Sequence, residues 1–137
     1  MSDTLTAGLT ATRRIDIDAA RTISFMGDEC RVYSTPNLLS DVEWACRDLI
    51  KEHVDAGKDS VGTRVELDHT GASLMGMWVE ITVSIARVEG PAVYFEFTAR
   101  DAVEQVANGK HNRFVVGIEK TAQRLMAKRA KAGSAGG

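Results

Sequence analysis

One long amphipathic segment followed by four alternating segments constrains the fold of this chain more than any other feature. In residues 39–54, LSDVEWACRDLIKEHV, apolar side chains recur at helical spacing and form a broad arc. The segments that follow alternate apolar and polar residues, as half-buried strands do: 62–70, 78–88, 92–100 and 109–119. A helix with so wide an apolar arc needs a sheet to cover it. We therefore predict an α+β domain, an antiparallel β-sheet wrapped around one long central α-helix.

Local signals place the ends of these elements. The central helix is predicted to run to about Ala56, because Gly57 follows and glycine commonly terminates helices. The position of its N-terminus has two competing interpretations. Ser40–Glu43 has the S-x-x-E pattern of a capping box, whereas Thr35–Pro36 resembles an N-cap followed by a proline in the first turn. The remaining predicted elements are a first strand over 10–18, a turn at 89–91 and a short terminal helix over 120–131.

The alternation also predicts which side chains share a face. Charged residues of the helix, Asp41 among them, are assigned to its outer arc. In the strands the predicted inward series are Thr63, Val65, Leu67 and His69; Val79, Ile81, Val83 and Ile85; and Val93, Phe95, Phe97 and Ala99. In the last strand, Phe114, Val116 and Ile118 fall on one face.

Length and composition indicate an ordinary globular domain and argue against several functions. The chain has 137 residues, 44% hydrophobic and 26% charged, with a net charge of -2. The absence of a central basic cluster argues against nucleic-acid binding. No signal peptide or apolar run of about 18 residues is present, so we expect a cytoplasmic protein without a membrane partner. Cys30 and Cys46 lack metal-ligand spacing, so no metal site is predicted. The predicted organisation is a flexible N-terminus (1–9), one domain (10–131) and a flexible tail (132–137).

Two polar residues lie on faces that should be buried. Glu43 falls inside the apolar arc of the helix, and His69 continues an inward strand series. Burying either side chain alone would be costly, so the two should pair or line a cleft, where a carboxylate can act as a general base. Two structural explanations compete with this one. Glu43 could belong to the capping box, and His69 could be a core histidine bonded to a backbone carbonyl.

Several short motifs, in order and spacing, resemble the fluoroacetyl-CoA thioesterase family of hotdog-fold proteins. These are "EWAC" in the helix, "GT" and "HT" at the ends of the next strand, "RVEG", and a final G-x-H-x-R. The resemblance extends from about Thr35 to Lys120. It implies a hotdog domain, a homodimer with sites near the subunit interface, or a pair of such dimers, and hydrolysis of a small or medium acyl-CoA thioester. No cofactor is implied beyond the CoA of the substrate.

The resemblance also implies the site residues. Thr35, Glu43 and His69 match the catalytic threonine, glutamate and histidine, while Gly62 and Arg113 match residues that line the substrate pocket. Eight residues of continuous helix would separate Thr35 from Glu43 by about 12 Å. Thr35 must therefore lie on a loop that folds back, or be supplied across the dimer.

Several mechanisms and reaction types are compatible with these residues. Glu43 could activate a water molecule as a base or attack the thioester carbonyl to give an anhydride. His69 would orient or protonate the reacting groups, and backbone amides near the helix start would stabilise the oxyanion. A hotdog domain could instead hydrate or dehydrate acyl-CoA, or bind acyl groups without catalysis.

Overall fold

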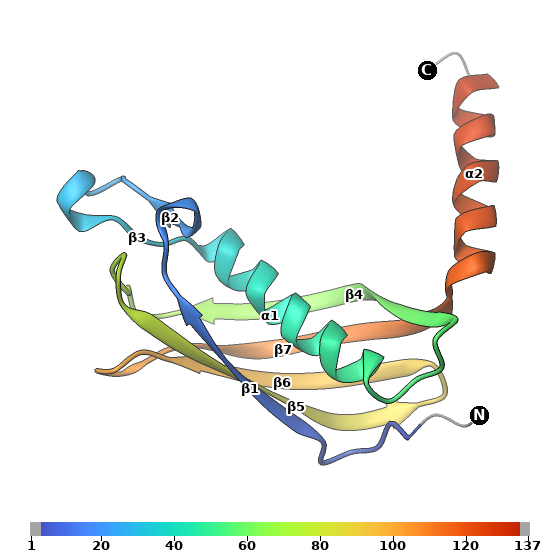
Figure 1. Cartoon of the computed structure of the whole chain (residues 1–137), viewed down its shortest axis with the longest axis horizontal. Coiled ribbons are helices and arrows are strands. Elements are labelled where there is room, and N and C mark those ends of the chain that lie inside the picture. The colour runs from blue at the N-terminus through green and yellow to red at the C-terminus, as the bar shows by residue number, and fades with distance from the viewer. Residues whose placement is uncertain (1–3, 135–137) are drawn as a thin grey trace.

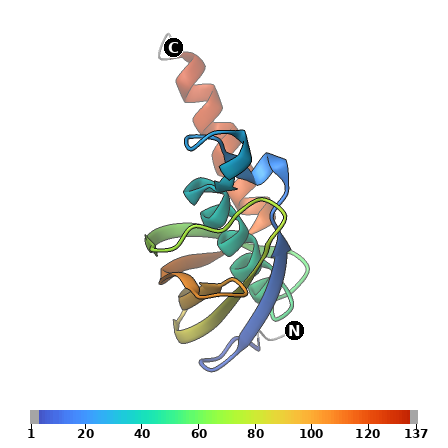
Figure 2. The same ribbon diagram turned by 90° about the vertical axis from the view of Figure 1, so that its left-hand side faces the viewer.

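A computed structural model describes residues 4–134 as one long helix enclosed by an antiparallel sheet (Figure 1). The five strands run in the order β1-β5-β6-β7-β4. The sheet curves around α1 (Figure 2), which confirms the predicted α+β architecture. The elements are β1 (Thr10–Asp16), β2 (Thr22–Ile23), β3 (Val32–Tyr33), α1 (Thr35–Lys51), β4 (Lys58–His69), β5 (Trp78–Glu89), β6 (Ala92–Arg100), β7 (Gln105–Gly117) and α2 (Ile118–Ser134).

Helix α1 begins one residue after Ser34, which is its N-cap. The Ser34 side chain accepts a hydrogen bond from the backbone amide of Asn37 at 3.2 Å, and Pro36 lies in the first turn. Thr35 is therefore the first residue of the helix rather than its cap. The capping box at Ser40–Glu43 does not start the helix, because these residues already lie within it.

The predicted helix end near Ala56 is wrong, because α1 ends at Lys51. The chain has to reverse within a few residues to enter β4 at Lys58 and pair with β7. The ammonium group of Lys51 donates hydrogen bonds to the carbonyls of Ala56 (3.3 Å) and Lys58 (2.5 Å) across this reversal. A cation in the last turn also stabilises the negative end of the helix dipole.

The buried face of α1 carries one carboxylate that the sequence analysis assigned to the outer arc. Asp41 is only 8% exposed, so that assignment is wrong. Its Oδ2 accepts hydrogen bonds from the hydroxyl of Tyr33 at 2.5 Å and from Nε of Arg21 at 3.0 Å. These partners compensate the cost of burial and tie the β2–β3 segment to α1. The apolar residues of this face are Leu38, Val42, Ala45, Cys46, Leu49 and Ile50.

The predicted faces of β5 and β6 are confirmed, because both inward series are buried against α1. The two strands nearer the β4 edge differ. In β7, His111 and Arg113 face inward, whereas Phe114 is 42% exposed on the other face and Ile118 begins α2. In β4, only Leu67 and His69 of the predicted series are even half-buried, and a bulge interrupts the register between Gly62 and Arg64. Near the β4 edge, the inner face of the sheet carries polar groups in place of apolar core side chains.

The two ends of the described chain differ in their contacts. Within the predicted flexible N-terminus, the amide of Thr4 donates to the carbonyl of His53 and that of Gly8 to Ile85, both at 2.9 Å. At the other end, α2 continues through Ser134, and the last three residues of the predicted tail, 135–137, lie outside the described residues, as do 1–3. Neither α1 nor α2 is long and apolar enough to cross a membrane.

Candidate active site

The first cluster of predicted site residues joins the start of α1 to the end of β4. Thr35 Oγ1 and His69 Nδ1 lie 2.8 Å apart, a hydrogen-bond distance. They border a hollow of about 240 Å³ whose lining is Ile23, Val32, Tyr33, Thr35, His69, Thr70, Gly71 and Ala72. The structure therefore brings Thr35 and His69 together, at a small and partly apolar pocket.

Burial favours the neutral form of the His69 imidazole. Partial burial lowers its pKa below the ordinary value of 6.5, and the backbone of Gly71 acts in the opposite direction. Its Nε2 atom is buried and has no hydrogen-bond partner among the described residues. Buried nitrogen atoms are normally satisfied, so a neutral imidazole with a free nitrogen is suited to accept a proton or a hydrogen bond from a ligand.

The second cluster surrounds Glu43 in the middle of α1. Its Oε2 lies 3.6 Å from Nη1 of Arg113, and the two side chains are 44% and 7% exposed, respectively. The carboxylate thus faces an open space while its counter-ion is buried. The two residues border a groove of about 340 Å³, whose other lining residues are Ser40, Trp44, Arg47, Asp59 and Ser60.

Arg113 is fixed in place by two residues that sequence reasoning did not assign to the site. Its Nε donates to Ser60 Oγ and its Nη2 to the Ser60 carbonyl, both at 2.8 Å. His111 Nδ1 donates to the carbonyl of Arg64 at 2.9 Å, which leaves Nε2 to accept from Arg113 Nη1 at 3.2 Å. Burial lowers the pKa of both Arg113 and His111, which favours the neutral form of this imidazole. The strict alternation of β7 is the signal that could have placed His111 beside Arg113.

Gly62 is required by the close packing around the Glu43 carboxylate. A Cβ atom at this position would lie 2.9 Å from Glu43 Oε2, 3.1 Å from His111 Cε1 and 3.6 Å from Arg113 Nη1. The absent side chain therefore leaves room for the carboxylate beside β4. The structure places the two predicted pocket residues, Gly62 and Arg113, next to Glu43 and not next to His69.

The two clusters are separate within one chain. Thr35 and Glu43 belong to the same continuous helix, and eight residues of helix span about 12 Å. The alternative in which Thr35 sits on a loop that folds back is therefore wrong. One chain carries a Thr35–His69 half and a Glu43–Arg113 half. Among the described residues, no group of three His, Cys, Asp or Glu side chains is arranged to hold a metal ion.

Comparisons with known proteins point to one family. The model of the family described as FlK, fluoroacetyl-CoA-specific thioesterase, matches residues 17–119. The fluoroacetyl-CoA thioesterase of Streptantibioticus cattleyicolor is 32% identical over 89 residues, which are 65% of this chain and 64% of that protein. The match therefore spans slightly less than two thirds of this relative.

Solved structures agree with the sequence comparisons. The structure of the fluoroacetyl-CoA thioesterase FlK superposes with a TM-score of 0.83 at 26% identity, covering 92% of this chain and 98% of that one. A point variant of FlK in complex with fluoroacetate and CoA gives a TM-score of 0.77 at 26% identity, covering 85% and 99%. A hot-dog-like protein from Thermanaerovibrio acidaminovorans gives 0.81 at 24% identity, covering 89% and 91%. The predicted hotdog fold is thus confirmed.

Proposed function

This chain belongs to the fluoroacetyl-CoA-specific thioesterase family, and from that premise we propose that it hydrolyses a short acyl-CoA thioester to the free acid and CoA. We further propose that the reaction occurs at two identical sites of a homodimer. Each site combines Thr35 and His69 of one protomer with Glu43, Gly62 and Arg113 of the other. The observation that carries this proposal is the separation of the two half-sites within one chain.

The free edge of β4 supports such a dimer. β4 has 12 residues and, among residues 4–134, pairs only with β7, so its other edge is open to pairing within this part of the chain. Val61 and Val65 are 44% and 40% exposed on it, and Trp44 of the adjacent helix is 56% exposed. A long, partly apolar strand edge is a template for pairing with another chain. Two copies of β4 can therefore pair antiparallel about a two-fold axis.

One register of this pairing completes the site. If the axis passes through Glu66, Arg64 lies opposite the partner's Asp68. Because the bulge adds Thr63 between Arg64 and Gly62, His69 then lies opposite the partner's Gly62. Directly opposed residues in an antiparallel pair project to the same face of the sheet. Both positions face α1, because His69 contacts Thr35 and a Cβ at Gly62 would contact Glu43. This register therefore sets the His69 imidazole beside the partner's Glu43.

The chemistry follows from these groups. Glu43 removes a proton from water, and the resulting hydroxide attacks the thioester carbonyl carbon; the tetrahedral intermediate then expels the CoA thiolate, which takes up a proton. In the alternative route Glu43 itself attacks the carbonyl carbon and the CoA thiolate leaves, which gives an acyl–Glu43 anhydride; water then cleaves the anhydride to the free acid and the Glu43 carboxylate. Arg113 keeps the carboxylate in position, while His69 and Thr35 hydrogen-bond the reacting oxygen atoms. The start of α1 provides a positive dipole near the oxyanion.

The small hollow beside His69 supports a short acyl group. Its volume of about 240 Å³ lies below the usual range for pockets that enclose drug-sized ligands. Incubation with short, branched and aromatic acyl-CoAs and a thiol reagent tests the reaction class. Release of CoA, fastest with short acyl groups, is expected. A change in enoyl absorbance would identify a hydratase, and binding without turnover a non-catalytic module; either result contradicts the proposal.

Subunit complementation tests the composite site. Glu43→Gln and His69→Ala dimers should each be nearly inactive, because each lacks one half of both sites. After co-expression in equal amounts, half of the dimers combine one chain of each kind and contain one intact site. About a quarter of the wild-type activity should therefore return. No recovery would mean that Glu43 and His69 act within one chain, or not at all.

A further inference from the structure

Helix α2 has an apolar stripe that the described part of its own chain leaves largely exposed. The helix leaves the body of the molecule after β7 (Figure 1), and none of its residues is buried. Ile118, Leu125 and Met126 are 46%, 60% and 57% exposed. Together with Ala122 they have the i, i+4, i+7, i+8 spacing of one helix face. An amphipathic helix of this length gains most of its stability by packing that face, so the stripe lacks a partner.

A second exposed apolar patch lies at the far end of the sheet. Leu74 and Met75 of the β4–β5 loop are each 45% exposed, and Val103 of the β6–β7 loop is 76% exposed. The two loops are joined by a 2.8 Å hydrogen bond from Ser73 Oγ to Asp101 Oδ2. We call Leu74, Met75 and Val103 the loop patch.

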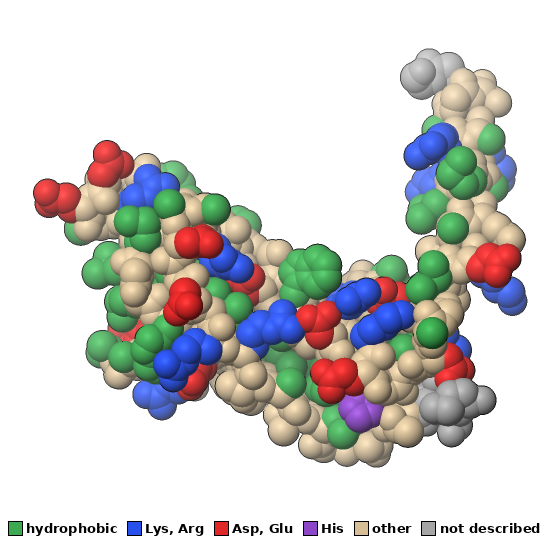
Figure 3. All heavy atoms as spheres, in the orientation of Figure 1, with side chains coloured by type: hydrophobic (Ala, Val, Ile, Leu, Met, Phe, Trp, Pro, Cys, Tyr) green, Lys and Arg blue, Asp and Glu red, His purple; other side chains and the backbone are tan. Residues whose placement is uncertain are grey.

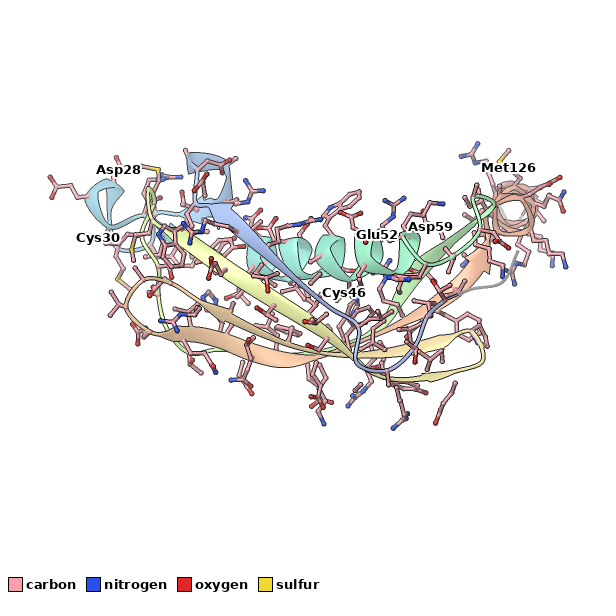
Figure 4. All side chains as sticks on the ribbon, turned by 60° about the horizontal axis from the view of Figure 1, so that its bottom comes forward. Asp28, Cys30, Cys46, Glu52, Asp59 and Met126 are labelled. Atoms are coloured by element: carbon pink, nitrogen blue, oxygen red, sulfur yellow. The ribbon has the colours of Figure 1, made fainter. Side chains whose placement is uncertain are left out.

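The stripe and the loop patch cannot meet within one chain. Gly117, the last residue before α2, pairs with Lys58 at the start of β4, whereas the loop patch follows the other end of β4 at His69. Figure 4 shows Met126 at one end of the molecule and Asp28 at the opposite end, beyond α1. A contact between the stripe and the patch therefore requires a second copy of the chain.

We propose that α2 of each protomer packs its stripe on the loop patch of the other. This inference rests on the β4-paired dimer of the proposed function. In the register that sets His69 opposite the partner's Gly62, the β4–β5 loop that follows His69 lies toward the partner's strand end at Lys58. The partner's α2 starts beside that strand end, because the Ile118 amide donates to the Gly57 carbonyl at 2.9 Å. The stripe thus begins next to Leu74.

Charge supports the same contact. The cations of α2 are Lys120, Arg124, Lys128, Arg129 and Lys131, and its first turn holds one acidic residue, Glu119. The end of the molecule that carries the loop patch has exposed carboxylates at Asp28, Glu29, Asp68 and Glu104. Figure 3 shows Lys and Arg side chains along α2 and acidic ones at the tip of the opposite end. Opposite charges on the two surfaces favour their association.

The contact has a consequence for catalysis. Leu74 pairs in a β-bridge with Val32, which lines the hollow beside Thr35 and His69. A helix packed on the loop patch therefore supports the outer wall of the acyl pocket of the other protomer. Each subunit then provides both Glu43 and α2 to the partner's site.

Cysteine cross-linking tests the contact in the full-length protein. In a Cys30→Ser background, Val103→Cys combined with Leu125→Cys should form a covalent dimer on mild oxidation. The matched control replaces Leu125→Cys by Ala127→Cys, about half a turn away on the opposite face of α2. It should remain monomeric on a denaturing, non-reducing gel. Equal cross-linking of both pairs, none in either, or a covalent species larger than a dimer would overturn the proposal.

A second measurement does not depend on the cysteines. Leu125→Ser with Met126→Ser should raise the dimer dissociation constant by about tenfold or more, whereas the polar-face control Gln123→Ser should not. An unchanged constant, or a stripe-dependent binding of α2 to phosphatidylserine–phosphatidylcholine vesicles, would overturn it. If activity recovers in the Glu43→Gln/His69→Ala mixture but the Val103→Cys/Leu125→Cys protein forms no cross-link, only the α2 contact is refuted. If the cross-link forms but the unmodified protein releases CoA from none of the thioesters, only the proposed function is refuted.

Discussion

Replacing Gly62 by alanine should separate the position of the Glu43 carboxylate from the stability of the fold. The new Cβ would lie 2.9 Å from Glu43 Oε2, whereas ordinary contacts begin at 3.4 Å, so the carboxylate must move by at least 0.5 Å. Glu43 is 44% exposed, so its side chain can move into the groove. The buried His111 ring, 3.1 Å from the new Cβ, has to move by only about 0.3 Å. We therefore expect the free energy of unfolding to change by less than about 1 kcal/mol.

The effect of Gly62→Ala on kcat/KM should be much larger than its effect on stability. Misplacement of a reacting group by about 1 Å can cost on the order of 100-fold in rate, so a shift of half that size or more should lower kcat/KM by about 10- to 100-fold. The assay is CoA release detected with a thiol reagent, run beside urea unfolding monitored by circular dichroism. The expected result is a large loss of activity with a nearly unchanged unfolding midpoint.

Two other glycines provide controls. A Cβ at Gly57 meets nothing within 4 Å, so Gly57→Ala should retain both activity and stability. A Cβ at Gly109 would lie 1.9 Å from the backbone carbonyl oxygen of Glu66, so Gly109→Ala should destabilise the protein by several kcal/mol, about the largest effect of single substitutions. Wild-type turnover in Gly62→Ala, or an activity loss that merely follows a loss of stability as in Gly109→Ala, would refute the reasoning.

Three further results are expected from the same network. Glu43→Gln and His69→Ala should each lower kcat by two or more orders of magnitude, about the contribution of general acid–base catalysis, with unchanged circular dichroism; wild-type rates in both would refute their assignment. Ser60→Ala removes the hydrogen-bond acceptor of Arg113 Nε, so kcat/KM should fall severalfold and the free energy of unfolding, measured by urea titration, should fall by about 1 kcal/mol. Unchanged kinetics would show that this bond does not position Arg113. The folded-state pKa of His111 lies below its unfolded value of 6.5, so the folded state binds fewer protons, and stability should decrease as the pH falls below about 6.5. Urea titrations at pH 7.5 and 5.5 should show this loss, and His111→Gln should reduce it; an equal loss in that variant would assign it to other groups.

The strands of the central sheet show what alternation can predict. β5 and β6 are covered on their inner face by α1, so burial forces an apolar residue at every second position, and their inward series were predicted correctly. The same rule failed for β7, because its inner face near Arg113 borders the site and carries polar side chains, while Phe114 lies outside. Hydrophobicity indicates which face is buried only where that face belongs to the core.

The outward assignment of Asp41 and the two predicted N-caps of the helix were wrong for a different reason. A helical wheel assigns the Asp41 carboxylate to solvent. Asp41 is buried because Tyr33 and Arg21, which lie outside the helix, donate hydrogen bonds to its oxygen atoms. The helix start was ambiguous because both Ser40 and Thr35 are reasonable N-terminal residues. Only the hydrogen bond from the Asn37 amide to Ser34 identifies the cap.

Periodicity in the sequence is enough to predict the α+β architecture and the central helix, and it singles out Glu43 and His69 as polar residues within otherwise apolar series. Which of these residues are neighbours is visible only in the tertiary structure. It joins Thr35 to His69, joins Glu43 to Arg113, Ser60 and His111, and holds the two groups apart along one helix. Such proximity depends on strand register and helix length together, and these are set by long-range packing that no local pattern encodes.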